Sequence, residues 1–152
     1  MSSLHDIRIR QLDKQLAPVA ELFPATPPVG WITTMRTALG MTLKALGNRL
    51  GMTAEGAKRM ELREADGTLS LQLLRKAAED LDMRLVYALV PKDGSLEKLI
   101  ERRALAMAKD IVMRTHQTMK LEGQAVSDER LKEAIAEKAD ELRRDMPKQL
   151  WD

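Results

Sequence analysis

Residues 41–63, MTLKALGNRLGMTAEGAKRMELR, constrain the fold most, because they carry the pattern of two short helices joined by a tight turn. Thr42 and Thr53 each stand at a helix-capping position, and Gly51 suits the left-handed backbone that ends a helix. Apolar residues recur at helical spacing in each half, Leu43, Leu46 and Leu50 in the first and Ala57 and Met60 in the second, and Met52 is the expected buried residue of the turn. The pattern predicts a helix-turn-helix.

Basic side chains are concentrated on this segment, although the net charge of the whole chain is only +2. Between residues 36 and 63 there are six bases and two acids, whereas after residue 91 there are thirteen of each. A local positive excess on a helix-turn-helix favours contact with the phosphates of double-stranded DNA. The balanced second half predicts a mixed-sign helical surface with another role.

The second helix of the motif is the expected recognition helix, whose first turns enter the major groove. The candidates for base contacts are Ala54, Glu55, Lys58 and Arg59. The candidates for phosphate contacts are Lys44, Arg49 and Arg63, and the capping residues Thr42 and Thr53 with Gly56 complete the predicted DNA-binding set. The alternative for Arg59 is a structural salt bridge with Glu55 or Glu61, since such pairs form readily on a helix.

The run LGMTAEGAKRMELREADGT resembles the Xre/Cro-type regulators, whose members carry an L-G-V-S-x-x-T-I-S-R-x-E-x-G-like run. The resemblance covers roughly residues 31–90 and implies a DNA operator as ligand. Two positions depart from the family pattern. Leu43 stands where a glutamine often braces the protein on the phosphate backbone, and Gly56 replaces a side chain that often faces DNA.

Three regions are predicted from the pattern along the chain. Residues 1–29 form a helical arm and a Pro-rich linker, residues 30–91 the DNA-binding domain, and residues 92–152 a helical segment. The apolar stripe of the arm, which includes Leu4, Ile7 and Leu12, predicts packing against the domain or a dimer partner. The alternative is that Arg8 and Arg10 of the arm contact DNA.

The fold expected for the whole chain is mainly α, with one short β-strand at about residues 84–90. That run, RLVYALV, is rich in β-branched and aromatic residues and is stopped by Pro91. A single strand needs a partner, and the same strand of a second copy would supply one. The pattern therefore predicts a homodimer, which suits a protein that reads paired half-sites.

A long helical pattern over residues 95–121 ends in the hexapeptide TMKLEG, and Ser127 caps a further helix. Thr118 and Glu122 lie one turn apart on one face, and Gly123 suits the end of the helix. The hexapeptide resembles the inhibitory motif of Fic-protein antitoxins, [S/T]-x-x-x-E-[G/N]. The resemblance implies that Glu122 pairs with the arginine that holds the ATP γ-phosphate in a Fic enzyme, with Thr118 as its positioning hydroxyl.

Most of the sequence after Gly30, including GWITTMRTALGMTLKALGNRLGM and RLVYALVP, is similar to the family called mobile mystery protein A. Members have an Xre-type domain and are encoded beside a Fic-domain protein. The resemblance implies an antitoxin that blocks AMPylation by a Fic toxin, in a toxin–antitoxin hetero-oligomer, and that represses its own operon. The alternative is a transcriptional regulator alone, whose C-terminal helices serve dimerisation.

Several function classes are not expected. The chain has no cysteine, and its two histidines, His5 and His116, lie far apart, so we expect no metal site and no cofactor. No nucleophile–base pair or phosphate-cradling loop indicates an enzyme, so no catalytic residue is predicted. Without a long apolar run or a signal-peptide pattern, the expected location is cytoplasmic, at the nucleoid when DNA is bound. The last residues, 146–152, are expected to be a frayed tail rather than an anchor through Trp151.

Overall fold

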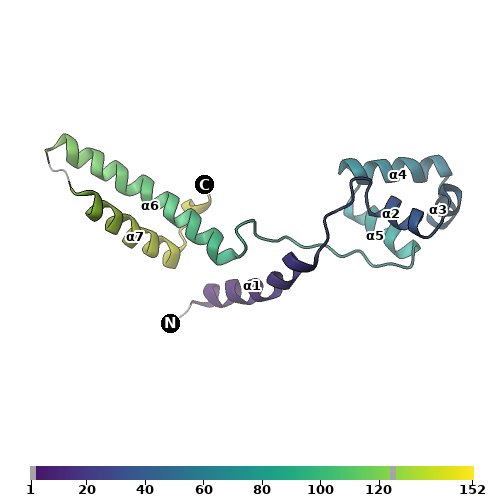
Figure 1. Ribbon diagram of the computed structural model, residues 1–152, viewed down its shortest axis with the longest axis horizontal. Helices are drawn as coiled ribbons and strands as arrows, with labels where there is room; N and C mark the ends of the chain where they lie inside the picture. Colours follow the sequence, from purple (N-terminus) through teal and green to yellow (C-terminus); the bar gives the residue numbers. More distant parts are fainter. Residues whose placement is uncertain (1–2, 124–125) are drawn as a thin grey trace. The chain divides into compact units, whose positions relative to one another are not determined.

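The computed structural model describes residues 3–123 and 126–152, and in these residues the chain is all-α, with seven α-helices and no strand (Figure 1). It divides into two compact units. One consists of residues 23–88, and the other combines residues 1–22 with residues 89–152. Each unit has its own hydrophobic core.

The unit of residues 23–88 contains four helices: α2 (Trp31–Ala38), α3 (Leu43–Leu50), α4 (Ala54–Asp66) and α5 (Leu71–Asp80). Their apolar faces meet in a core that contains the residues expected from the helical spacing. The buried members are Ile32, Leu46, Leu50, Ala57, Met60, Ala77 and Leu81. Because α3 and α4 share most of this core, the predicted pair of helices around a turn is confirmed.

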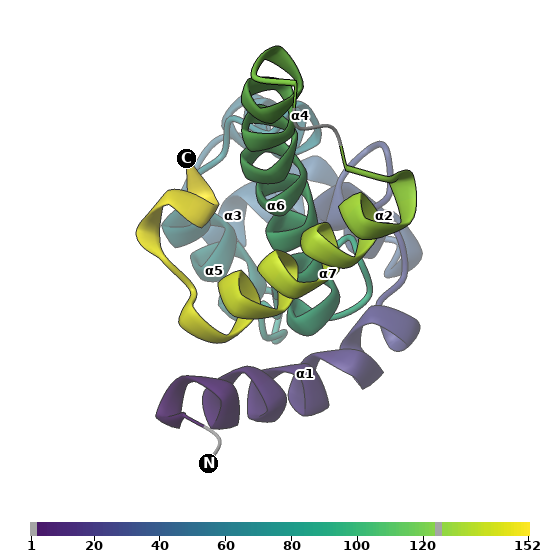
Figure 2. The ribbon, with the colours of Figure 1, turned by 90° about the vertical axis from the view of Figure 1, so that its left-hand side faces the viewer.

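The other unit is built on α6 (Leu96–Leu121) and α7 (Asp128–Asp145), which pack side by side as a hairpin (Figure 2). Helix α1 (Leu4–Leu22) lies against α6, and a short 3₁₀-helix, η1 (Lys148–Trp151), completes the unit. The buried core residues are Ile100, Ala104, Ala108, Leu142 and Leu150. Small alanines at Ala104 and Ala108, one turn apart, allow α6 and its neighbours to approach closely.

Helix α1 is fixed to the start of α6 by a carboxylate. Asp13 accepts hydrogen bonds from the backbone N–H groups of Leu96 (2.6 Å) and Glu97 (3.2 Å), two donors that a helix leaves without partners in its first turn. Ile9 packs on the core of this unit, whereas Leu4 and Ile7 of the expected stripe are exposed. The observed division therefore differs from the predicted regions 1–29, 30–91 and 92–152 by joining α1 to the C-terminal helices.

The predicted strand at residues 84–90 is not formed in the described part of the chain. These residues are in no helix or strand, and no backbone hydrogen bond joins them to another described segment. The reason is physical: a strand is defined by its hydrogen bonds to a neighbour, and the remaining sequence forms helices.

The prediction of a frayed C-terminal tail is wrong. Leu150 is 2% exposed, and the guanidinium of Arg103 donates hydrogen bonds to the carbonyls of Leu150 (2.9 Å) and Asp152 (3.1 Å). The Trp151 ring is half exposed, with the Arg103 guanidinium 6.0 Å from its centroid. The tail is ordered because an apolar side chain enters the core while one arginine binds the terminal carbonyls.

None of the described helices combines the length and hydropathy needed to span a membrane.

Candidate functional sites: a helix-turn-helix and a helix-end carboxylate

The turn between α3 and α4 is formed by the residues that the sequence pattern indicates. The Thr42 hydroxyl accepts a hydrogen bond from the N–H of Ala45 (3.1 Å), and the Thr53 hydroxyl accepts one from the N–H of Gly56 (3.0 Å). Gly51 ends α3 in the left-handed conformation, with φ at 68°. The two predicted caps and the predicted terminator are confirmed, so the entry of α4 is fixed by local hydrogen bonds.

Gly47 allows α3 to approach this turn. A Cβ at position 47 would lie 2.6 Å from the carbonyl oxygen of Met52, a backbone atom that cannot move without displacing the turn. At Gly56 a Cβ would lie 3.3 Å from the Thr53 hydroxyl and 3.4 Å from the Met52 Cβ. The absence of a side chain at Gly56 therefore makes room for the cap and for Met52.

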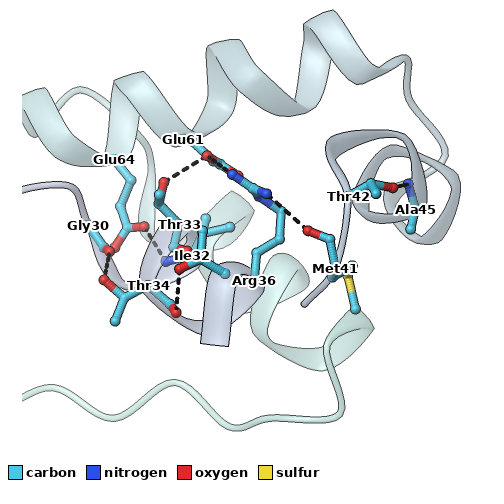
Figure 3. Close-up of polar contacts among 11 residues, drawn as sticks. Gly30, Ile32, Thr33, Thr34, Arg36, Met41, Thr42, Ala45, Glu61 and Glu64 are labelled. Atoms are coloured by element: carbon cyan, nitrogen blue, oxygen red, sulfur yellow. Dashed lines mark hydrogen bonds and ion pairs between the residues drawn. The ribbon is translucent and has the colours of Figure 1, made fainter. Parts of the chain in front are cut away.

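Two carboxylates of α4 hold α2, as Figure 3 shows, and the first is Glu64. It accepts hydrogen bonds from the N–H groups of Trp31 and Ile32, both at 2.8 Å, and so supplies the missing cap at the start of α2. Gly30, with φ at 85°, lies directly beneath it: a Cβ there would be 2.8 Å from Glu64 Oε1.

The second carboxylate is Glu61, which is only 2% exposed. It accepts from the Thr33 hydroxyl (2.7 Å) and from the guanidinium of Arg36, whose Nη1 also donates to the carbonyl of Met41 (3.0 Å) (Figure 3). Arg36 thus joins α4 to the residue just before the Thr42 cap. One cation and one anion fix the orientation of α2, α4 and the start of α3.

Sequence reasoning missed the role of Glu61 and Glu64 and treated Arg36 as part of the local positive excess. A signal was present in the spacing. Glu61 and Glu64 follow Ala57 at intervals of four and three, so both acids lie on the inward face of α4. Acids on a buried face require basic or N–H partners.

The predicted DNA contacts fall into two groups. Lys44, Lys58 and Arg59 are exposed and make no hydrogen bond or ion pair in the part of the chain that the structure describes. Arg49 donates to the carbonyl of Asp80 (3.1 Å) and lies 3.6 Å from the carboxylate of Asp82. Arg63 donates to the carbonyl of Thr68 (3.1 Å). Of the predicted phosphate contacts, two arginines are therefore engaged within the unit and one lysine is not.

The alternative prediction for Arg59, a structural salt bridge with Glu55 or Glu61, is not met in the described chain. Glu61 is buried against Arg36, and no ion pair joins Arg59 to Glu55 among the residues that the structure describes. Ala54 and Glu55 are exposed in the first turn of α4, on the same part of the helix as Lys58. The exposed start of α4 thus presents one acid and two bases without structural partners.

A turn closes α4 at Asp66 and Gly67. Hydrogen bonds from the hydroxyl (2.6 Å) and the N–H (3.0 Å) of Thr68 hold the pKa of Asp66 below its usual range. The residue after Asp66 has φ at 81°, the left-handed conformation that ends the helix. This turn determines where α5 begins, directly after the Ser70 cap.

The second candidate site lies at the end of α6. The N–H of Glu122 donates to the carbonyl of Thr118 (3.2 Å), and Gly123 has φ at 80°, which confirms it as the residue where the helix stops. The Thr118 hydroxyl donates to the carbonyl of Arg114 (3.1 Å) and makes no bond to the Glu122 carboxylate. Glu122 is exposed and is in no ion pair of the described chain.

No cluster of three or more potential metal-ligating His, Asp or Glu side chains occurs among residues 3–123 and 126–152. Comparison of the sequence with protein-family models found no match. Comparisons with curated proteins and with solved structures also found no match.

Proposed function

We propose that this protein is an antitoxin with two functions: it represses its own operon by binding DNA through α3 and α4, and it inhibits a Fic-domain adenylyltransferase through Glu122. The observation that carries the first half is the exposed start of α4. There Lys58 and Arg59 stand without an ion-pair partner beside Glu55, while Glu61, three residues after Lys58, is bound to Arg36 of α2.

The chemistry of this surface suits DNA. Arginine binds guanine in a bidentate manner, and glutamate accepts a hydrogen bond from cytosine, each contact contributing roughly 1–3 kcal/mol of discrimination. Lys44 on α3 is the phosphate contact, because its charge has no partner in the described chain. The DNA-binding residues of the proposal are Lys44, Ala54, Glu55, Lys58 and Arg59. Thr42, Thr53 and Gly56 hold the turn, and Arg49 and Arg63 stabilise the unit.

The second half of the proposal is supported by the exposed helix-end carboxylate. Glu122 follows the last residue of α6, so its exposed side chain stands at the end of that helix. A carboxylate that meets a guanidinium makes a charge-assisted pair, and such a pair competes with a phosphate oxygen for the arginine. The resemblance of TMKLEG to the Fic inhibitory motif supplies the partner: the arginine that holds the ATP γ-phosphate.

The alternative proposal is a transcriptional regulator without a toxin partner, whose C-terminal helices serve dimerisation. One observation favours it: α6 and α7 pack on each other around a core of their own, with Leu142 and Ala104 buried. A hairpin that is complete in this way serves as a structural extension without any ligand at Glu122.

A crossed pair of variants separates the two proposals. DNA that binds the wild-type protein is first selected from a random pool. For each variant, the affinity for this DNA and the inhibition of the Fic-domain protein encoded beside the gene are then measured. Arg59→Ala is expected to lower DNA affinity about tenfold or more and to leave inhibition unchanged, and Glu122→Ala to do the reverse. Arg75→Ala, an exposed arginine on α5, is the matched control for Arg59. Loss of DNA binding alone, with no inhibition by the wild type, would establish the regulator.

A further inference from the structure

We propose that residues 84–90 form an antiparallel two-stranded ribbon with the same residues of a second copy of this chain, centred on Tyr87. The first observation is the backbone. From Arg84 to Val90 no N–H or carbonyl group is hydrogen-bonded within the described chain. The run is bounded by Met83, whose N–H is bound to the carbonyl of Ala78 (2.8 Å), and by Pro91, which has no N–H.

The second observation is the side chains. Val86, Tyr87, Leu89 and Val90 are 54%, 61%, 90% and 44% exposed. Four neighbouring large apolar residues, three of them strong strand formers, are unusual on an exposed segment and mark an interaction surface. A backbone segment with free hydrogen-bonding groups and exposed apolar side chains is what β-strand addition requires.

The occupant that fits this template is the segment itself. When two copies of one strand pair about a twofold axis, the position of that axis along the strand determines which residue of one copy lies opposite each residue of the other. If the axis is perpendicular to the ribbon, opposite residues lie on the same face, so the centre falls on a residue and not between two. Antiparallel pairing itself fixes this orientation, because a twofold axis parallel to the strands would make them parallel.

The candidate centres in the middle of the run are Val86, Tyr87 and Ala88, and they differ in the residues that they bring opposite each other. A centre at Ala88 places Arg84 opposite Lys92, so two positive charges meet. A centre at Val86 leaves Leu89 opposite Met83, whose N–H is already bound, and Val90 has no partner within the run.

A centre at Tyr87 uses the whole run from Arg84 to Val90. It pairs Leu85 with Leu89, Val86 with Ala88 and Tyr87 with its own copy, so three of the four exposed apolar side chains lie beside an apolar partner. Apolar contacts along the ribbon make the segment complementary to itself.

Because the chain has no cysteine, a variant with one introduced cysteine can form a disulfide only with the same position of a second copy, and so reports the register. In the proposed ribbon the two copies of Tyr87→Cys lie directly opposite, with Cα atoms about 5 Å apart, which suits a disulfide. The two copies of Val86→Cys would be offset by two residues and about 8 Å apart, beyond the reach of a disulfide. Leu121→Cys, also at a highly exposed position, measures random collision.

The expected result, for the full chain without DNA or toxin, is that Tyr87→Cys cross-links at least about tenfold faster than either of the other variants. Faster cross-linking of Val86→Cys would overturn the register. Equal rates for all three variants would overturn the interface. Tyr87 and Val86 are both exposed in the single chain, so neither substitution removes a core residue.

Sedimentation equilibrium gives a second, independent readout. Leu89→Glu is expected to raise the dimer dissociation constant at least about tenfold, since it puts a charge against Leu85 of the other copy. Leu121→Glu is the matched control, because Leu89 and Leu121 are both 90% exposed. A wild type that is monomeric at micromolar concentration, or equal effects of the two variants, would contradict the ribbon. Neither assay contains DNA or a Fic protein, so failure here leaves the proposed function to its own test.

Discussion

The guanidinium of Arg36 is bound to the buried carboxylate of Glu61, and their side chains are only 13% and 2% exposed. This ion pair joins α2 to the inner face of α4, and a further bond from Arg36 reaches the residue before α3. The contacts that hold α4 in place are therefore made by its inner face, and its outer face is not needed for them. Residues on the outer face are available to a ligand.

Removal of Glu61 is expected to destabilise the protein strongly. Glu61→Ala leaves the Arg36 guanidinium buried without its counter-ion, which costs about 3–5 kcal/mol in the free energy of unfolding. Urea denaturation followed by circular dichroism measures it. The double variant Arg36→Met/Glu61→Met should recover much of the loss, because no buried charge remains. A single variant as stable as the wild type would show that the pair contributes nothing.

Glu64 is expected to contribute less, through hydrogen bonds alone. Glu64→Ala removes the acceptor of the Trp31 and Ile32 N–H groups and should cost about 1–2 kcal/mol. Glu79→Ala, an exposed acid on α5, is the control for loss of surface charge. Equal losses of stability in the two variants would contradict the capping role of Glu64.

Helices α3 and α4, the turn between them and their caps could be predicted from sequence, whereas the bracing of α2 could not. Thr42, Gly51 and Thr53 act on neighbours within four residues, so their types and spacing are sufficient evidence. Glu64 acts on residues 32 and 33 positions away, and such a bond depends on how the helices pack. The free state of Lys58 and Arg59 follows from the same packing, since it depends on where the acids of α4 point.

The second unit shows the same limit. Both ends of α6 and the start of α7 were predictable from Ser95, Gly123 and Ser127, whose effects are local. The attachment of α1 depends on Asp13 reaching the first turn of α6, more than eighty residues later. Residues 84–90 are in no helix or strand of the described chain, although their composition favours a strand, because a strand also needs a neighbouring segment to pair with.

Gly47 should not tolerate a methyl group. Gly47→Ala places a Cβ 2.6 Å from the Met52 carbonyl oxygen, so the turn must shift, at an expected cost of about 1–3 kcal/mol. The matched control is Asn48→Ala, at the next, exposed position of α3. Thermal denaturation measures both variants. If Gly47→Ala were as stable as Asn48→Ala, the close approach of α3 to the turn would not be a constraint.

The anchored C-terminus predicts a difference between adjacent residues. Leu150→Ala should cost about 2–5 kcal/mol, because a buried side chain leaves a cavity in the α6–α7 core. Trp151→Ala should cost less, since the ring is half exposed. Urea denaturation of the two variants gives the comparison, and a larger effect at Trp151 would contradict the anchor through Leu150.

A surface ion pair predicts a pH dependence at the start of α6. Hydrogen bonds from the Arg102 guanidinium (2.8 and 3.1 Å) hold the pKa of Asp93 below its usual range. A lowered pKa means that the pair stabilises the fold above the ordinary aspartate value of about 3.9, and that this contribution is lost as the pH falls through the folded value. The stability advantage of the wild type over Asp93→Asn should therefore shrink between about pH 5 and pH 3. An advantage that is constant over this interval would contradict the assignment.

The proposed inhibition is tested most directly by the autoadenylylation of the Fic-domain protein that the family resemblance implies is encoded beside this gene. It is measured alone, with the wild type, with Glu122→Ala, and with Glu129→Ala, an exposed acid at the start of α7 that serves as the matched control. Pull-down of the Fic protein shows that each variant is bound. The account predicts suppression by the wild type and by Glu129→Ala, and recovered activity with bound Glu122→Ala. Activity that is unchanged by the wild type, or equally suppressed by Glu122→Ala, would contradict it.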